Sequence, residues 1–165
     1  MAIEKFETQW GGRNLIIETG KLAGQANGSC TVQYGDTLVL ATCVMSTSTR
    51  EVDFLPLSVE YEEKLYAAGK IKSSRFIKRE GRPSDEAILT GRLVDRSIRP
   101  LFSQAIRQDI QVILTVFSVD GENDSDIPAL LAASTALSIS DIPWAGPIAG
   151  CRVGFISSET ATTGA

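Results

Sequence analysis

The first 64 residues consist of short runs in which apolar and polar side chains alternate, separated by turn-forming residues. Alternation with a period of two puts every second side chain on the same face, so these runs predict half-buried β-strands. Two pairs of runs are joined by the turn signals Gly11-Gly12 and Gly35-Asp36, and each pair is expected to form a β-hairpin. The expected strands span residues 6–10, 15–19, 30–34, 37–44 and 55–61.

Helix-like and strand-like patterns alternate in the second half of the chain. Ser84, followed by Asp85 and Glu86, is typical of a helix start, because serine caps free backbone N–H groups and acids favour the positive end of the helix dipole. Pro100 is expected to end this first helix. The remaining patterns predict a strand over 109–119, an alanine-rich second helix from Pro128 and a last strand over 148–156.

This order of elements predicts an α+β domain, with two helices packed on one face of a mostly antiparallel sheet. Four apolar residues of the first helix region are expected to face the core: Leu89, Leu93, Val94 and Leu101. The domain is expected to occupy residues 1–156. The polar tail of small residues, 157–165, is expected to be disordered or a truncated end.

Composition fits one globular domain, since 43% of the 165 residues are hydrophobic and 22% are charged. No apolar run is long enough to cross a bilayer, and the first residues do not form a signal peptide, so we expect a cytoplasmic protein without a membrane partner. The absence of histidine excludes Ser–His and Cys–His nucleophile pairs. Cys30, Cys43 and Cys151 are expected to be buried, reduced thiols.

Basic residues are concentrated in residues 64–107, which we call the basic belt. The belt holds 11 of the 16 lysines and arginines but only 4 of the 20 acids, which makes it net +7 in a chain of net charge −4. Such a belt is typical of a nucleic-acid surface, because each neutralised phosphate releases condensed counterions. The alternative is a solvated helix face with salt bridges. Four acids are too few to pair with eleven cations.

Three arginines of the belt, Arg92, Arg96 and Arg99, are spaced to share one stripe of the first helix. Guanidinium groups bind phosphate through paired hydrogen bonds, so the stripe is a candidate phosphate-contacting surface. Asp95 is placed to orient both Arg92 and Arg99. The alternative is a structural arginine network that holds the helix to a loop or a subunit through carboxylates. The sequence leaves both interpretations open.

Shortly before this helix, the aromatic residue Phe76 is followed by three cations, Lys78, Arg79 and Arg82. Aromatic rings stack on unpaired bases while cations contact the backbone, so these residues are candidates for binding single-stranded nucleic acid. The acidic run 120–126 lacks the sixth-position glycine and the terminal glutamate of an EF-hand, and no metal site is expected in this chain.

The chain resembles the bacterial polynucleotide phosphorylase family from about Phe6 to Ile156, in the first of that family's two ribonuclease PH-like core domains. The similarity is carried by residues 126–156 and by two strings, ETGKLAGQANGSCTVQYGDTLVLAT at 18–42 and GKIKSSRFIKREGRPSDEAILTGRLVDRSIRPLF at 69–102. It implies the ribonuclease PH-like fold, which is also described as ribosomal protein S5 domain 2-like.

The resemblance also implies an activity: 3′-to-5′ phosphorolysis of single-stranded RNA. In this reaction inorganic phosphate is the co-substrate, Mg²⁺ is required and nucleoside diphosphates are released. The family's phosphate site and metal-binding aspartates lie mainly in the second core, so neither catalytic residues nor Mg²⁺ ligands are expected here. This chain is expected to supply RNA binding and assembly of a homotrimeric ring, with RNA-degradation proteins as further partners. The alternative is a stand-alone, non-catalytic RNA-binding or ring-scaffold module of the same fold.

Site residues follow from the resemblance position by position. The family's loop of two phenylalanines and two arginines, which lines the neck of the trimer's channel, corresponds to residues 76–79. Ile77 and Lys78 depart from this pattern, which is expected to weaken base stacking and paired phosphate contacts. Arg92, Arg96 and Arg99 correspond to the family's arginine helix, which faces the active-site region.

Overall fold

The computed structural model describes residues 2–71 and 82–155, so the expected disordered tail lies outside the described residues. The described elements, in chain order, are β1 Glu4–Trp10, β2 Arg13–Thr19, β3 Gly28–Tyr34, β4 Thr37–Thr49, β5 Leu57–Glu63, the 3₁₀ helix η1 Leu65–Ala68, α1 Asp85–Ile98, the 3₁₀ helix η2 Arg99–Leu101, β6 Gln108–Ser118 and α2 Asp126–Ser138.

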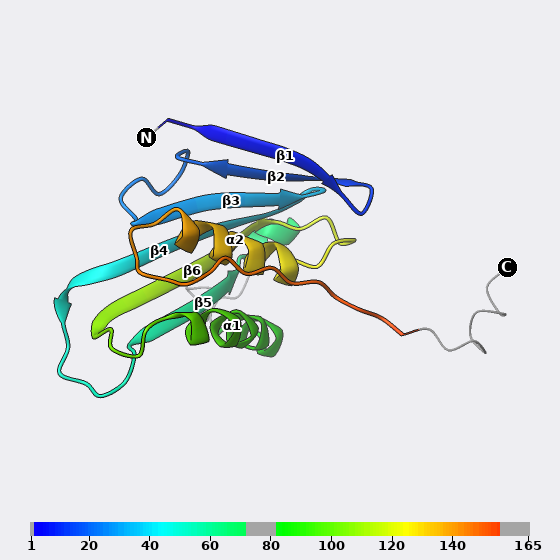
Figure 1. Cartoon of the computed structure of the whole chain (residues 1–165). Helices are drawn as coiled ribbons and strands as arrows, with labels where there is room; N and C mark the ends of the chain where they lie inside the picture. Colours follow the sequence, from blue (N-terminus) through cyan, green and yellow to red (C-terminus); the bar gives the residue numbers. More distant parts are fainter. Residues whose placement is uncertain (1, 72–81, 156–165) are drawn as a thin grey trace, which may run out of the picture.

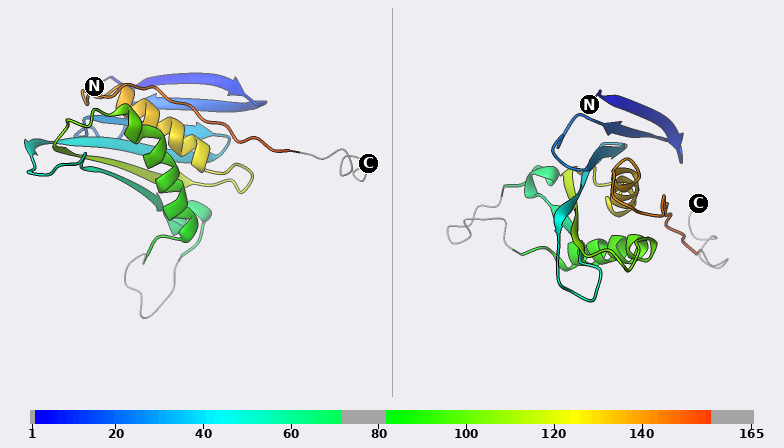
Figure 2. Two further views of the ribbon diagram at one scale, coloured as in Figure 1. Left: turned by 60° about the horizontal axis from the view of Figure 1, so that its bottom comes forward. Right: turned by 60° about the vertical axis from the view of Figure 1, so that its left-hand side comes forward.

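The strands form one sheet in the order β1-β2-β3-β4-β6-β5. All neighbouring strands are antiparallel except β5 and β6, which are parallel because the chain crosses over between them through α1. Both helices pack on the same face of the sheet (Figures 1 and 2). The predicted α+β fold, with a mostly antiparallel sheet and two helices on one face, is confirmed. Within the described residues, no helix is long and apolar enough to span a membrane.

Turn and cap residues act as the sequence predicts. Gly11 and Gly12 have φ values of +58° and +79°, which favour glycine, and they close the β1–β2 hairpin. The Ser84 side chain accepts a hydrogen bond from the Ala87 N–H at 3.0 Å and so caps α1, which ends at Ile98, before Pro100. Two-residue turns and a capped helix start are local signals, and the structure confirms both.

The buried side of α1 differs from the prediction. Val94 is buried as expected, but Leu89 and Leu93 are 63% and 45% exposed. The helix instead turns its smaller residues inward, at Ala87 and Gly91. A methyl group added to Gly91 would lie 3.6 Å from the Cβ of Tyr61 on β5. Small residues let the helix backbone approach the strand closely, and the leucines are left on the outer side.

The last predicted strand is wrong over 148–155, which pairs with no described strand. This segment runs past α2 on the helix side of the sheet (Figure 1), away from both sheet edges. It is held by side chains instead: the Ile148 N–H donates to the Ser134 hydroxyl at 2.9 Å, and Arg152 pairs with Asp124 and Asp126.

Two of the three cysteines are buried between the sheet and α2. The Cys30 thiol donates to the Ala132 carbonyl at 3.2 Å, and the Cys43 thiol donates to the Ala136 carbonyl at 3.3 Å. Burial raises the pKa of Cys30 to about 12 and also raises the pKa of Cys43, so both remain protonated thiols. Cys151 is exposed because its segment is not a sheet strand, so the expectation that it is buried is wrong.

Candidate nucleic-acid interface

The described part of the basic belt contains four of the candidate site residues: Arg82, Arg92, Arg96 and Arg99. The other candidates, Phe76, Lys78 and Arg79, lie outside the described residues. The described residues on either side of 72–81 meet at a cavity of about 480 Å³, which Lys70 and Arg82 both line. Cations therefore line this cavity on both sides of residues 72–81, together with Glu62 and Glu63.

The cations outside the belt have acidic partners. The ion pairs join Lys5 to Glu7, Arg13 to Glu122, Lys21 to Glu18, Arg50 to Asp109, and Arg152 to both Asp124 and Asp126. Within the belt, Lys64 pairs with Glu62 and Arg99 pairs with Asp95. The other described cations of the belt form no ion pair with an acid among residues 2–71 and 82–155; they are Lys70, Arg82, Arg92, Arg96 and Arg107. Uncompensated positive charge is thus concentrated in the belt.

Arg99 connects the end of α1 to the start of β5. Its Nε and Nη2 atoms lie 3.0 and 2.6 Å from the two carboxylate oxygens of Asp95. Nη2 also donates to the Leu57 carbonyl at 3.0 Å. The side chain is only 37% exposed. These contacts occupy most of the guanidinium donors, so Arg99 has a structural role in this chain.

Arg92 and Arg96 differ from Arg99 in that both are exposed. Arg92 lines a groove of about 480 Å³ between α1 and β5, together with Glu60 and Asp95. Asp95 forms its ion pair with Arg99, and the expected second pair with Arg92 is not formed. The guanidinium groups of Arg92 and Arg96 therefore remain available to a ligand.

Replacing Arg99 with alanine is expected to lower the free energy of unfolding by about 1–2 kcal/mol, because charge-assisted hydrogen bonds at a partly exposed site are lost. Urea denaturation of the chain measures this change. Arg96→Ala is the matched control on the same helix and is expected to change stability by no more than about 0.5 kcal/mol. Equal losses for the two variants would contradict the structural role of Arg99.

Tyr61 lies near the end of β5 and lines both the cavity beside Lys70 and Arg82 and the groove beside Arg92. Its hydroxyl is 2.6 Å from the Ser125 hydroxyl, which ties β5 to the start of α2. Burial raises the pKa of Tyr61 to about 12, so its phenol stays neutral at physiological pH. Tyr61 therefore positions the two elements and carries no charge.

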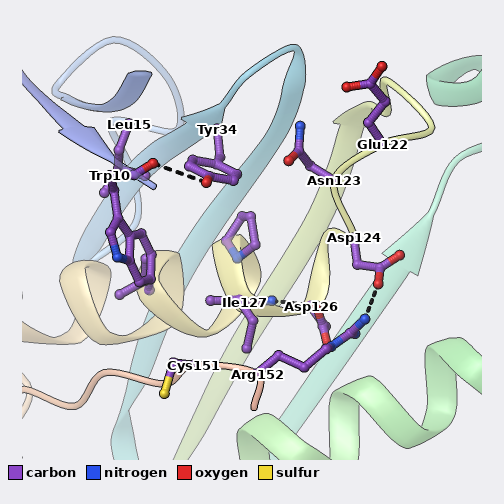
Figure 3. A pocket seen from close by; sticks show the side chains of 12 residues that line it. Trp10, Leu15, Tyr34, Glu122, Asn123, Asp124, Asp126, Ile127, Cys151 and Arg152 are labelled. Carbon is purple, nitrogen blue, oxygen red and sulfur yellow. Dashed lines mark hydrogen bonds and ion pairs between the residues drawn. The ribbon is translucent and has the colours of Figure 1, made fainter. Parts of the chain in front are cut away.

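A separate pocket of about 380 Å³ lies at the start of α2 (Figure 3). Trp10 and Tyr34 form one wall, with ring centroids 6.0 Å apart, and the Tyr34 hydroxyl donates to the Trp10 carbonyl at 3.1 Å. Asp124 and Asp126 contribute acidic groups to the pocket, and Arg152 lies against both. Sequence reasoning did not find this pocket, because its residues come from distant segments. Its acidic side chains make it less suited to a polyanion than the belt.

The described residues contain no group of three or more cysteine, aspartate or glutamate side chains placed to hold a metal ion. The acidic residues near the start of α2 are engaged in hydrogen bonds instead. Asp120 accepts from the backbone N–H groups of Asn123 and Glu122 at 2.8 and 2.9 Å, and these bonds lower its pKa. The carboxylate thus shapes the turn before α2.

Among known proteins, a family model and individual relatives both match most of this chain. The model of the 3′ exoribonuclease family, domain 1, matches residues 11–143. The polyribonucleotide nucleotidyltransferases of Macrococcus caseolyticus and Staphylococcus saprophyticus are 58% and 56% identical to the chain over 154 residues. In both cases the match covers 93% of this chain and 22% of the relative. The chain therefore spans about a fifth of the length of these relatives.

Solved structures share the fold at lower sequence identity. The Archaeoglobus fulgidus exosome with RNA bound to the active site contains a chain that is 20% identical, with a TM-score of 0.57. The match covers 88% of this chain and 57% of that one. Rice Rrp46 has a TM-score of 0.55 at 20% identity, with 86% and 57% covered. Likeness at this level of identity shows the fold alone.

Proposed function

The chain belongs to the 3′ exoribonuclease family, as the first ribonuclease PH-like domain of the polyribonucleotide nucleotidyltransferase type, and on this premise we propose that it supplies RNA binding and ring assembly to a phosphorolytic exoribonuclease. The proposed substrate of the whole protein is single-stranded RNA. Inorganic phosphate attacks the terminal 3′ linkage, and nucleoside diphosphates leave one at a time in the 3′-to-5′ direction.

One observation carries the RNA-binding role: the cations without acidic partners in the described ranges all belong to the basic belt. Arg82, Arg92 and Arg96 are exposed around the start and the outer side of α1. A chain of net charge −4 repels a polyanion elsewhere on its surface, so the belt sets where RNA docks. We assign phosphate contacts to these three arginines and a positioning role to Arg99.

The loop that carries Phe76, Lys78 and Arg79 extends this proposal. Lys70 and Arg82, on either side of it, line the same cavity as Ser84 and Ala87 at the start of α1, so a strand of RNA bound there also passes close to α1. Lys78 binds phosphate as a point charge, without the paired geometry of arginine. We propose that Phe76 stacks on a base while Lys78, Arg79 and Arg82 hold the backbone.

Ring assembly has a separate line of support. Ile88, Leu89 and Leu93 are 42%, 63% and 45% exposed on the outer side of α1. Neighbouring exposed apolar side chains of this size are typical of a protein–protein interface. We propose that Leu89 and Leu93 contact another core domain in a homotrimer, within a cytoplasmic RNA-degradation assembly. Arg92 and Arg96 lie beside them on the same helix, so this contact would leave the two arginines exposed at its rim.

Mg²⁺ and the reacting phosphate are proposed to bind outside this chain. The resemblance assigns the phosphate site and the metal-binding aspartates mainly to the second core. This chain therefore holds and orients RNA but contributes no group to the bond-breaking step.

Removing the two free arginines of α1 tests the RNA-binding role. The double variant Arg92→Ala, Arg96→Ala is expected to bind oligo(A) more weakly, because fewer phosphates are neutralised. The slope of log K against log salt concentration is expected to flatten by about 0.7 for each lost contact. Fluorescence anisotropy of labelled oligo(A) at several salt concentrations measures both effects.

Arg13→Ala is the control, because it removes one positive charge from an arginine that is paired with Glu122 outside the belt. This control is expected to leave the salt dependence nearly unchanged. A loss for the control that is about half the loss for the double variant would show that binding follows net charge alone, because the control removes one charge and the double variant removes two. That result would contradict an RNA site on α1.

A further inference from the structure

β1 forms one edge of the sheet and pairs with β2 on one side only. All seven of its residues are exposed, including Phe6 at 59% and Trp10 at 41%. Among residues 2–71 and 82–155, nothing pairs with the other side of the strand. A free edge with exposed aromatic residues is a template for another strand.

The β1–β2 hairpin determines which backbone groups are free. Trp10 and Arg13 flank the two-residue turn and form its closing hydrogen-bonded pair. Pairs alternate along an antiparallel ladder, so Phe6 also directs its N–H and C=O toward β2. Lys5, Glu7 and Gln9 direct theirs away from the sheet. These residues supply the hydrogen-bonding groups of the free edge.

The two faces of β1 differ in chemistry. Phe6 lies opposite Ile17, which packs against the core, so Phe6 and Trp10 are on the helix side of the sheet. Lys5 and Glu7 are on the other side, where they form an ion pair with each other. The edge therefore presents two aromatic side chains, with Glu4 and Thr8, on one face and charges of both signs on the other.

We propose that the free edge of β1 is a docking surface for a second copy of this chain, in which the two β1 strands pair antiparallel around a two-fold axis at Phe6. This register places Lys5 opposite the partner's Glu7 and Glu7 opposite the partner's Lys5. The backbone N–H and C=O groups of Lys5 and Glu7 point away from β2. Each Lys5–Glu7 pair across the axis can therefore also form the backbone hydrogen bonds of the new ladder. Phe6 meets the partner's Phe6 on the helix side.

The charges select this register over its neighbours. An axis at Lys5 or at Glu7 would place like charges opposite each other, which destabilises a cross-strand pair. An axis at Glu4 or at Thr8 would leave Lys5 opposite no acid. Charged residues on an edge strand deter unrelated strands, and here they favour a single pairing.

The contact is isologous, so it closes after two chains. It is therefore distinct from the ring contact proposed for the outer side of α1, and it stands whether or not that contact forms. Two strands of seven residues bury less area than a standard interface, and the association is expected to be weak and concentration-dependent.

Disulfide trapping tests the register. In a Cys151→Ser background the remaining native thiols, Cys30 and Cys43, are buried and do not compete. Phe6→Cys places two thiols opposite each other in a pair without ladder hydrogen bonds, where the side chains are close enough for a disulfide. Thr8→Cys, on the same face, would lie opposite the partner's Glu4. We expect a covalent dimer with Phe6→Cys and at most about one fifth as much with Thr8→Cys.

Charge reversal tests the ion pairs by sedimentation of the chain without added cysteines. Lys5→Glu or Glu7→Lys is expected to lower the association constant about tenfold, because each changes two symmetric pairs. The double variant restores opposite charges across the axis and is expected to return within about twofold of the original value. These exposed changes leave the core intact, and circular dichroism confirms folding.

Equal trapping of the two cysteine variants would show random collision and overturn the proposal. So would a double variant that stays as weak as the single variants. If Phe6→Cys disturbs the strand, the charge-reversal series decides alone, because it needs no substitution on the apolar face.

Discussion

Poly(A) incubated with this chain, inorganic phosphate and Mg²⁺ is expected to bind to the basic belt but to release no nucleoside diphosphate. The chain covers 22% of the length of its Macrococcus relative. The family resemblance places the phosphate site and the Mg²⁺ ligands in a second core domain. RNA binding without these groups positions the substrate but provides no site to hold the attacking phosphate and no charge stabilisation at the 3′ end. Chromatography of the released nucleotides measures the reaction.

Two controls make this result decisive. A longer protein that carries this chain as its first domain is expected to release nucleoside diphosphates, and only when phosphate is present. Phosphate-dependent release by the short chain would overturn the assignment of catalysis to another domain. If the longer protein is also inactive while RNA still binds, the chain is the stand-alone RNA-binding module considered above.

Gly28→Ala is expected to lower the free energy of unfolding by about 3 kcal/mol or more. The new methyl carbon would lie 2.2 Å from the Ala136 carbonyl oxygen of α2 and 2.9 Å from the Cys43 sulfur. The nearest obstacle is helix backbone, which cannot rotate away, so β3 and α2 must separate. Alanine is ordinarily favoured over glycine in a strand, so a loss of stability would report the clash. Thermal and urea denaturation measure it.

Gly24→Ala is the matched control, since a methyl group there would meet no atom within 4 Å. It is expected to leave stability unchanged within about 0.5 kcal/mol. If Gly28→Ala were as stable as this control, the close packing of β3 on α2 could not be the reason for glycine at position 28.

The parts of the fold that follow from local chemistry could be predicted from the sequence. Gly11 and Gly12 adopt positive φ angles in the first hairpin, and Ser84 caps its helix through its own hydroxyl. The signal in each case lies within a few residues. The candidate arginines could also be found by their spacing on one helix.

Three features could not be predicted because they depend on contacts between segments that are far apart in the sequence. Periodicity alone could not show that α1 approaches β5 closely enough to need Gly91 inward, so Leu89 and Leu93 were placed on the wrong side. Residues 148–155 have a strand-like pattern, but a strand also needs a neighbour, and none lies beside them in the described ranges. Arg99 has the spacing of the stripe, yet carbonyl groups about 40 positions earlier engage its donors.

The order of the strands in the sheet has a consequence for synthesis of the chain. β1 to β4 are neighbours both in sequence and in space, so they can pair as soon as they leave the ribosome. β4, which has 13 residues and many apolar side chains, must wait for β6 on its other side. At ordinary rates of translation this wait lasts on the order of ten seconds. The nascent chain is most exposed to aggregation after Thr49 has been made and before Gln108 to Ser118 arrive.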